Sequence, residues 1–358
     1  MRYKQGILAS PLCLPVLGAV IAAIAFSALL PGATIHAGGT IRQDKVSKVS
    51  KGDDRPAKLH VVSGNEGHPV LWNQSASIET LDLFYGSGSR QDAPDPSGKF
   101  YYAGRDNKGT QKETYVKDDK GREWIVKFGQ QARPEAVATR IVWAMGYHVD
   151  QDYLLPQVHI DGMPHPDALN VGFKPRPSGY EEVGLWDWQH NPFVGTRELD
   201  GLKVLMAFLD NWDLKSSNNK VVRPDNKSGE NPDDRIYYVA NLGATFGTTG
   251  SFEHDLHLPF HPAAGTKDEP FDYADEPFID GVIGGAVQFH YKGRDPAVMK
   301  GISVANAQWM GGMLARLSQK QLIDAFRAGG YGDMEISVLL RAIKDRIGEL
   351  QQAGQGNP

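Results

Sequence analysis

Cysteine is almost absent from this 358-residue sequence. The one cysteine, Cys13, lies before an apolar run near the N-terminus. A chain with a single cysteine forms no intramolecular disulfide and offers no multi-cysteine metal site. A basic excess is also missing, since 38 lysine and arginine residues stand against 43 aspartate and glutamate residues, for a formal net charge of −5. This balance gives no indication of a nucleic-acid partner or of an anionic membrane surface.

Long apolar runs are scarce, and the clearest one lies near the N-terminus. Residues 16–30 are uninterrupted apolar or small residues, preceded by Arg2 and Lys4 and followed by Pro31 and Gly32. A charged start, an apolar middle and a small-residue end are typical of a secretory signal peptide, here residues 1–37 with cleavage near Ala37. The run is short for the alternative, a permanent membrane anchor. We therefore expect an exported protein, periplasmic or extracellular, without a membrane span once the signal is removed.

The rest of the chain divides into three parts by composition. Residues 38–58 hold few large apolar side chains, so we expect a disordered tether. Residues 59–160 contain short strand-like runs separated by turn clusters, including a hairpin turn at residues 118–121, and they predict a small β-rich domain. Residues 161–358 contain amphipathic helices, such as residues 335–351. The proline-rich residues 164–177 are predicted as the connection between these two domains.

The most informative stretch is residues 201–220, GLKVLMAFLDNWDLKSSNNK. Its first half has the apolar spacing of a buried helix, with Thr196 as its cap. Its second half is polar, and Asp213 stands two residues before Lys215 and five before Asn218. Phosphoryl transfer needs a carboxylate to orient a hydroxyl, a cation near the phosphate and an amide oxygen on the metal, which these three could supply in that order. The alternative is an ordinary solvated turn.

A lysine interrupts the apolar strand predicted at residues 124–128. A buried amine costs free energy unless it is paired or reaches solvent, so Lys127 either lies at an edge or has a partner. A helix predicted at residues 134–145 follows, and Glu135 at its start could reach back to Lys127. An earlier turn, predicted at residues 105–110, contains Gly109. It could lie over nucleotide phosphates, or it could be an ordinary hairpin.

These motifs together resemble the protein-kinase-like superfamily. The Asp213 loop matches H-R-D-L-x-x-x-N, with Asn211 and Trp212 in place of the usual His and Arg, and Lys127 matches the lysine of V-A-I-K. The chain is most similar to the atypical bacterial, HipA-like branch, and within it to a group of exported bacterial proteins of unassigned function. The resemblance spans roughly residues 81–350 and is carried by three segments, EAVATRIVWAMGY from Glu135, NWDLKSSNN from Asn211 and NLGATFG from Asn241.

The resemblance implies an α+β fold of two lobes, a small N-terminal antiparallel β lobe and a larger, mostly helical C-terminal lobe. It implies a cleft that binds ATP or another nucleotide with Mg or Mn. The implied roles are nucleotide positioning for Lys127, Glu135 and Gly109, catalytic base for Asp213, phosphate contact for Lys215, and metal ligation for Asn218 and Asn241. Asn241 departs from the pattern, which has an aspartate there. An amide lacks the negative charge that favours magnesium, so metal affinity should fall.

We therefore expect nucleotide-dependent phosphoryl transfer to a hydroxyl acceptor that the sequence does not identify. Asn241 leaves two alternatives open. One is a pseudokinase that binds a nucleotide or a protein partner without catalysis. The other is a cell-envelope binding or structural protein that uses the fold for neither purpose.

Overall fold

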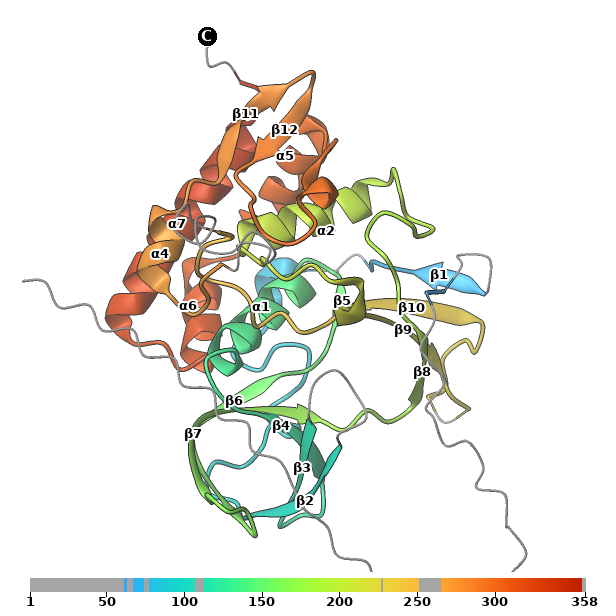
Figure 1. Cartoon of the computed structure of the whole chain (residues 1–358), viewed down its shortest axis with the longest axis vertical. Helices are drawn as coiled ribbons and strands as arrows, with labels where there is room; N and C mark the ends of the chain where they lie inside the picture. The colour runs from blue at the N-terminus through green and yellow to red at the C-terminus, as the bar shows by residue number, and fades with distance from the viewer. Residues whose placement is uncertain are drawn as a thin grey trace, which may run out of the picture. The chain divides into compact units, whose positions relative to one another are not determined.

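The computed structural model describes residues 61–62, 67–73, 77–106, 113–226, 228–250 and 265–355. The expected signal peptide, the expected tether and Gly109 lie outside these residues. All described elements belong to one compact unit, residues 55–358, and together they form a mixed α/β fold (Figure 1). Among the described helices, none combines the length and the apolar character that crossing a membrane requires.

Five strands close into a small barrel in the order β2-β3-β4-β7-β6. Its interior is apolar and aromatic, with Trp124 packed edge-on against Phe173. The predicted turn at residues 118–121 is present, because the Asp118 carboxylate accepts hydrogen bonds from the backbone N–H groups of Lys120 and Arg122. The strands are β2 Phe100–Asp106, β3 Glu113–Asp118, β4 Glu123–Lys127, β6 Tyr153–Asp161 and β7 Asp167–Pro175.

The prediction of a connection at residues 164–177 is wrong, because most of this stretch is strand β7. β7 pairs antiparallel with both β4 and β6, and it lies beyond the boundary expected at residue 160. Its prolines do not prevent pairing, since Pro164 and Pro166 precede the strand and Pro175 is its last residue.

A second sheet contains β8 Tyr180–Gly184, β9 Asn219–Pro224 and β10 Asp234–Val239. The short strands β1 His68–Val70 and β5 His148–Val149 both pair in parallel with β10. Helix α1 Ala132–Ala144 follows β4 and precedes β5 along the chain, and it is buried along most of its length. Figure 1 shows the barrel strands below α1 and this second sheet to its right.

The remaining helices pack around the largest apolar cluster. Thr196 caps the N-terminus of α2 by accepting a hydrogen bond from the Leu199 N–H, and Ser318 and Gln321 form a capping box at α6. The cap at Thr196 agrees with the sequence prediction. The elements are α2 Arg197–Phe208, α4 Pro270–Asp275, the hairpin β11 Ile279–Ile283 and β12 Ala286–Phe289, α5 Val304–Leu314, α6 Gln319–Ala328 and α7 Asp333–Gln352, with short 3-10 turns at Ile78–Thr80, Ser216–Asn218 and Pro296–Met299.

A buried ion pair ties α7 to the end of α2. Arg346 donates to the carboxylate of Asp210 at 2.8 Å, and both side chains are almost fully buried. The same guanidinium donates to the backbone carbonyls of Phe208 and Tyr273. A buried charge with this many partners fixes where the chain leaves α2, and the polar loop that contains Asp213 begins there.

Candidate functional site

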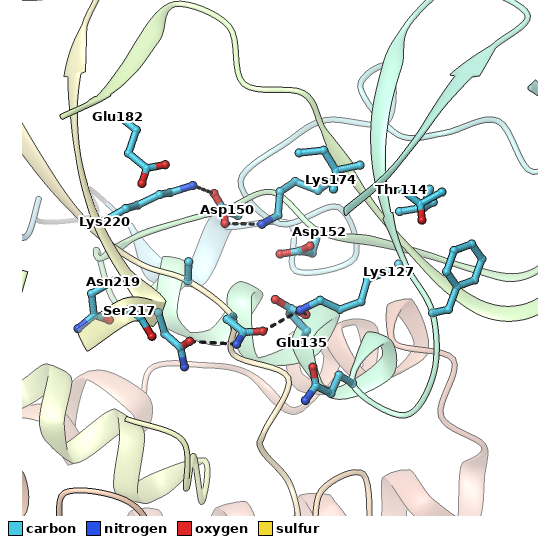
Figure 2. Close-up of a pocket in the computed structure, with 18 of the residues that line it drawn as sticks. Thr114, Lys127, Glu135, Asp150, Asp152, Lys174, Glu182, Ser217, Asn219 and Lys220 are labelled. Atoms are coloured by element: carbon cyan, nitrogen blue, oxygen red, sulfur yellow. Dashed lines mark hydrogen bonds and ion pairs between the residues drawn. The ribbon is translucent and has the colours of Figure 1, made fainter. Parts of the chain in front are cut away.

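A cavity of about 600 Å³ is lined by the barrel, by α1 and by the second sheet. Figure 2 shows its lining side chains, which come from β4, β7, β8 and β9 as well as from α1. Cavities of this size are large enough for a small organic ligand or a nucleotide. Charged residues contribute heavily to this lining: Arg105, Lys127, Glu135, Asp150, Asp152, Lys174, Glu182 and Lys220.

Lys127 and Glu135 meet on one side of this cavity. Along β4, Val126 faces the barrel core while Lys127 faces outward, since successive side chains of a strand point to opposite faces. The Lys127 amine donates a hydrogen bond to the Glu135 carboxylate, which comes from the first turn of α1 and is 3% exposed. The structure therefore brings together the two residues that the sequence suggested as a pair.

Asn241 and Asn218 continue from Lys127 as a row of side-chain amides. The Lys127 amine donates to Asn241 Oδ1 at 2.9 Å, and Asn241 Nδ2 donates to Asn218 Oδ1 at 3.1 Å. Asn218 Nδ2 then donates to the backbone carbonyl of Asp213 at 2.7 Å. Asn241 has a φ of 56°, a left-handed conformation that asparagine adopts more readily than most residues. One hydrogen-bonded chain thus runs from Lys127 to the Asp213 loop.

The Asp213 carboxylate lies beside this row and is held between two cations. Its Oδ2 lies 2.9 Å from Lys215 Nζ, and its Oδ1 lies 3.2 Å from Arg294 Nε. Asp213 is 8% exposed, whereas both cations are more than one-third exposed. Sequence reasoning missed Arg294, because it is far from Asp213 along the chain and no motif marks it.

Three further charged residues form a cluster on another side of the cavity. The buried Asp150 carboxylate accepts from Lys174 Nζ at 2.6 Å and also from the Lys220 amine. Burial alone would raise the pKa of Asp150, but the two lysines outweigh it and hold that pKa well below its usual range. Sequence reasoning missed this cluster as well, since its members come from three separate segments.

Asp152 has a different environment, although it is only two residues from Asp150. Its Oδ2 is buried and has no hydrogen-bond partner among the described residues. Burial, followed by the negative charge of Glu135, raises the pKa of Asp152 to about 7. In Figure 2 this carboxyl group lies between the ends of Lys174 and Lys127. The only sequence signal was the D-x-D spacing immediately before the apolar start of β6.

The described residues do not fit a magnesium site as they stand. The two amide oxygens expected as ligands are already acceptors, since Asn241 Oδ1 accepts from Lys127 and Asn218 Oδ1 accepts from Asn241. No group of three or more histidine, cysteine, aspartate or glutamate side chains in the described part of the chain is placed to hold a metal ion. Magnesium prefers anionic oxygen ligands, and this row offers none.

Comparisons with known proteins give a distant structural similarity and no sequence match. No protein-family model matches the chain, and no curated protein sequence matches it. Among solved structures, the chain is similar to the proinflammatory kinase CtkA of Helicobacter pylori, with 12% sequence identity and a TM-score of 0.40. The match covers 70% of this chain and 94% of that chain. At this level of similarity, membership of the HipA-like branch stays a prediction.

Proposed function

We propose that this cavity binds a nucleotide and that the protein transfers a phosphoryl group from it to a hydroxyl acceptor. The proposal includes a two-lobed, kinase-like organisation, with the barrel and α1 in the smaller lobe. The observation that carries it is the hydrogen-bonded chain from Glu135 through Lys127, Asn241 and Asn218 to the Asp213 loop. This chain joins a cation that can contact phosphates to the loop whose carboxylate can orient a hydroxyl, and these are two of the functions that phosphoryl transfer requires.

In this proposal each side chain has one task. Lys127 contacts the phosphates, and the buried Glu135 holds its amine in place. Asp213 accepts the hydrogen bond of the attacking hydroxyl, and Lys215 beside it faces the transferred group. A magnesium or manganese ion, if used, would arrive with the nucleotide phosphates.

A second candidate function is nucleotide binding without catalysis. It is favoured by Asn241, whose amide is hydrogen-bonded to both Lys127 and Asn218. This amide brings no negative charge to the site. Arg294 Nε lies 3.2 Å from Asp213 Oδ1, and its positive charge would make the proposed base weaker. Both candidates use the same cavity, and they differ only in whether a phosphoryl group moves.

We further propose that the protein acts after export, in the periplasm or outside the cell. The apolar run at residues 16–30 supports this proposal. A kinase-like protein in that location depends on a supply of nucleotide there. The expected hydroxyl acceptor is then a molecule of the same compartment.

The two candidates are separated by measuring transfer of a labelled γ-phosphoryl group from ATP to the protein itself and to water. An aspartate at position 241 would add a charged oxygen ligand for the metal, so we expect Asn241→Asp to raise the transfer rate at least about tenfold. Adding Lys127→Met to this variant should abolish the gain. Lys117→Met, which changes an exposed lysine on β3, is the matched control and should change nothing. If Asn241→Asp binds ATP and still transfers no phosphoryl group, the non-catalytic candidate is correct.

A further inference from the structure

The proposed phosphate contacts leave much of the charge in the cavity without a role. Asp150, Lys174 and Lys220 form a cluster separate from Lys127 and Glu135, and Asp152 lies between the two groups (Figure 2). A nucleotide whose phosphates contact Lys127 would place its base against this cluster. The polar edge of that base would then meet charged side chains.

We propose that Asp152 and Lys174 recognise the polar edge of the bound base, and that this edge is of the guanine type. This inference rests on the proposed function, because it names the base of the nucleotide that the same cavity would hold. A guanine edge presents an amino group, a ring N–H and a carbonyl oxygen side by side. The first two are donors for the Asp152 carboxylate, and the third is an acceptor for the Lys174 amine.

Asp152 is suited to this contact because nothing in the described part of the protein satisfies it. A buried carboxylate oxygen without a partner costs free energy, which a ligand with N–H donors would recover. Asp150 does not have this property, since its oxygens already accept from two lysines. A purely structural network therefore explains Asp150, but it leaves Asp152 unexplained.

Lys174 is suited to the carbonyl oxygen for a similar reason. An ammonium group has three N–H donors, and Lys174 is seen to use one of them on Asp150. Its positive charge also acts on Asp152, so the carboxylate and the cation are neighbours, as the guanine edge requires. Adenine fits less well, because beside its amino group it presents a ring nitrogen whose lone pair would face the second carboxylate oxygen.

The base-binding form of Asp152 is the carboxylate, so the contact depends on pH. The charged groups that act on it are Lys174 on β7, Lys127 on β4, Glu135 on α1 and Asp150 next to it in the chain. With a pKa of about 7, Asp152 is mostly ionised at pH 8 and mostly protonated at pH 6. GTP affinity should therefore fall by up to about tenfold from pH 8 to pH 6.

The test is isothermal titration of the full chain with GTP, ITP and ATP in the presence of magnesium. At pH 8 we expect GTP to bind at least about fivefold more tightly than ATP, with ITP between them because it lacks the amino group. Asp152→Asn, which keeps the size of the side chain but removes its charge, should abolish this preference and the extra pH dependence. Asp119→Asn makes the same change in the exposed turn after β3, outside the cavity lining, and should keep both.

Equal affinity for GTP and ATP, with both lost in Lys127→Met, would overturn this inference and leave the proposed function intact. Binding of neither nucleotide would overturn both. If Asp152→Asn does not fold, the GTP-to-ATP ratio and the pH dependence of the unmodified protein decide the question. A preference for GTP that does not change between pH 8 and pH 6 would exclude Asp152 as the group that reads the base.

Discussion

At the scale of single residues, the ionisation of a buried carboxyl group depends more on its nearest charged neighbours than on its place in the sequence. Asp150 and Asp152 are two positions apart and line the same cavity. Two lysines stabilise the ionised form of Asp150, whereas burial and Glu135 disfavour the ionised form of Asp152. The protein therefore contains one carboxylate that contributes to stability and one that reduces it at neutral pH.

This difference predicts how stability depends on pH. The pKa of Asp152 is about 7 in the folded protein, above its ordinary value of 3.8. At pH values between 3.8 and 7, the folded protein therefore keeps a proton on Asp152 that the unfolded protein has lost. The contribution of Asp152 to stability is therefore highest below about pH 4, falls as the pH rises to about 7, and stays low above it. Asp152→Asn removes this loss, and at pH 8 we expect the variant to be more stable by roughly 2–4 kcal/mol.

The measurement is urea unfolding of both proteins from pH 4 to pH 8. The difference in unfolding free energy between Asp152→Asn and the unmodified protein should grow with pH and become constant above about pH 7. Asp119→Asn should show no such trend, because Asp119 is exposed. A difference that does not vary with pH would contradict the account of Asp152.

At the scale of elements, the close packing of α2 is evident at a glycine. Gly201 lies in its first half, against Trp309 of α5. A Cβ atom at Gly201 would come within 2.4 Å of the Trp309 ring and 2.8 Å of the Tyr147 hydroxyl. Gly348 in α7 has the opposite environment, since a Cβ atom there would meet nothing within 4 Å.

These two glycines give a matched pair of predictions for one substitution. Gly348→Ala should stabilise the protein by about 0.5–1 kcal/mol, because alanine favours the helix and fills only open space. Gly201→Ala gains the same preference but forces apart well-packed side chains, so we expect a net loss of about 1–3 kcal/mol. Urea unfolding midpoints measure both. Stabilisation by Gly201→Ala would show that α2 and α5 pack less closely than described.

Local signals explain which elements the sequence predicts. The caps at Thr196 and Ser318 and the turn at Asp118 each depend on residues within four positions of one another, so the sequence is sufficient to find them. β7 was missed because its strand character depends on its partners β4 and β6, while its flanking prolines resemble those of a loop.

At the scale of the whole molecule, closure of the barrel and assembly of the cavity both depend on contacts between distant segments. β2 closes the barrel by pairing with β6, where Phe100 faces Ile160, and no local pattern indicates that pair. The family resemblance implied that Lys127, Glu135, Asn218 and Asn241 belong to one site, and hydrogen bonds connect these four side chains in the structure. Their roles stay predictions. The cluster of Asp150, Lys174 and Lys220 has no motif, so it could not be found from the sequence.

The central claim, that this cavity binds a nucleotide, is tested most directly by a thermal-shift titration of residues 38–358 with ATP, with and without magnesium or manganese. A ligand that binds only the folded state raises the melting temperature as its concentration increases. We expect such a rise in the unmodified protein and in Lys117→Met, and its loss in Lys127→Met. A melting temperature that does not change at millimolar nucleotide would contradict the account and would favour an envelope-associated binding or structural role.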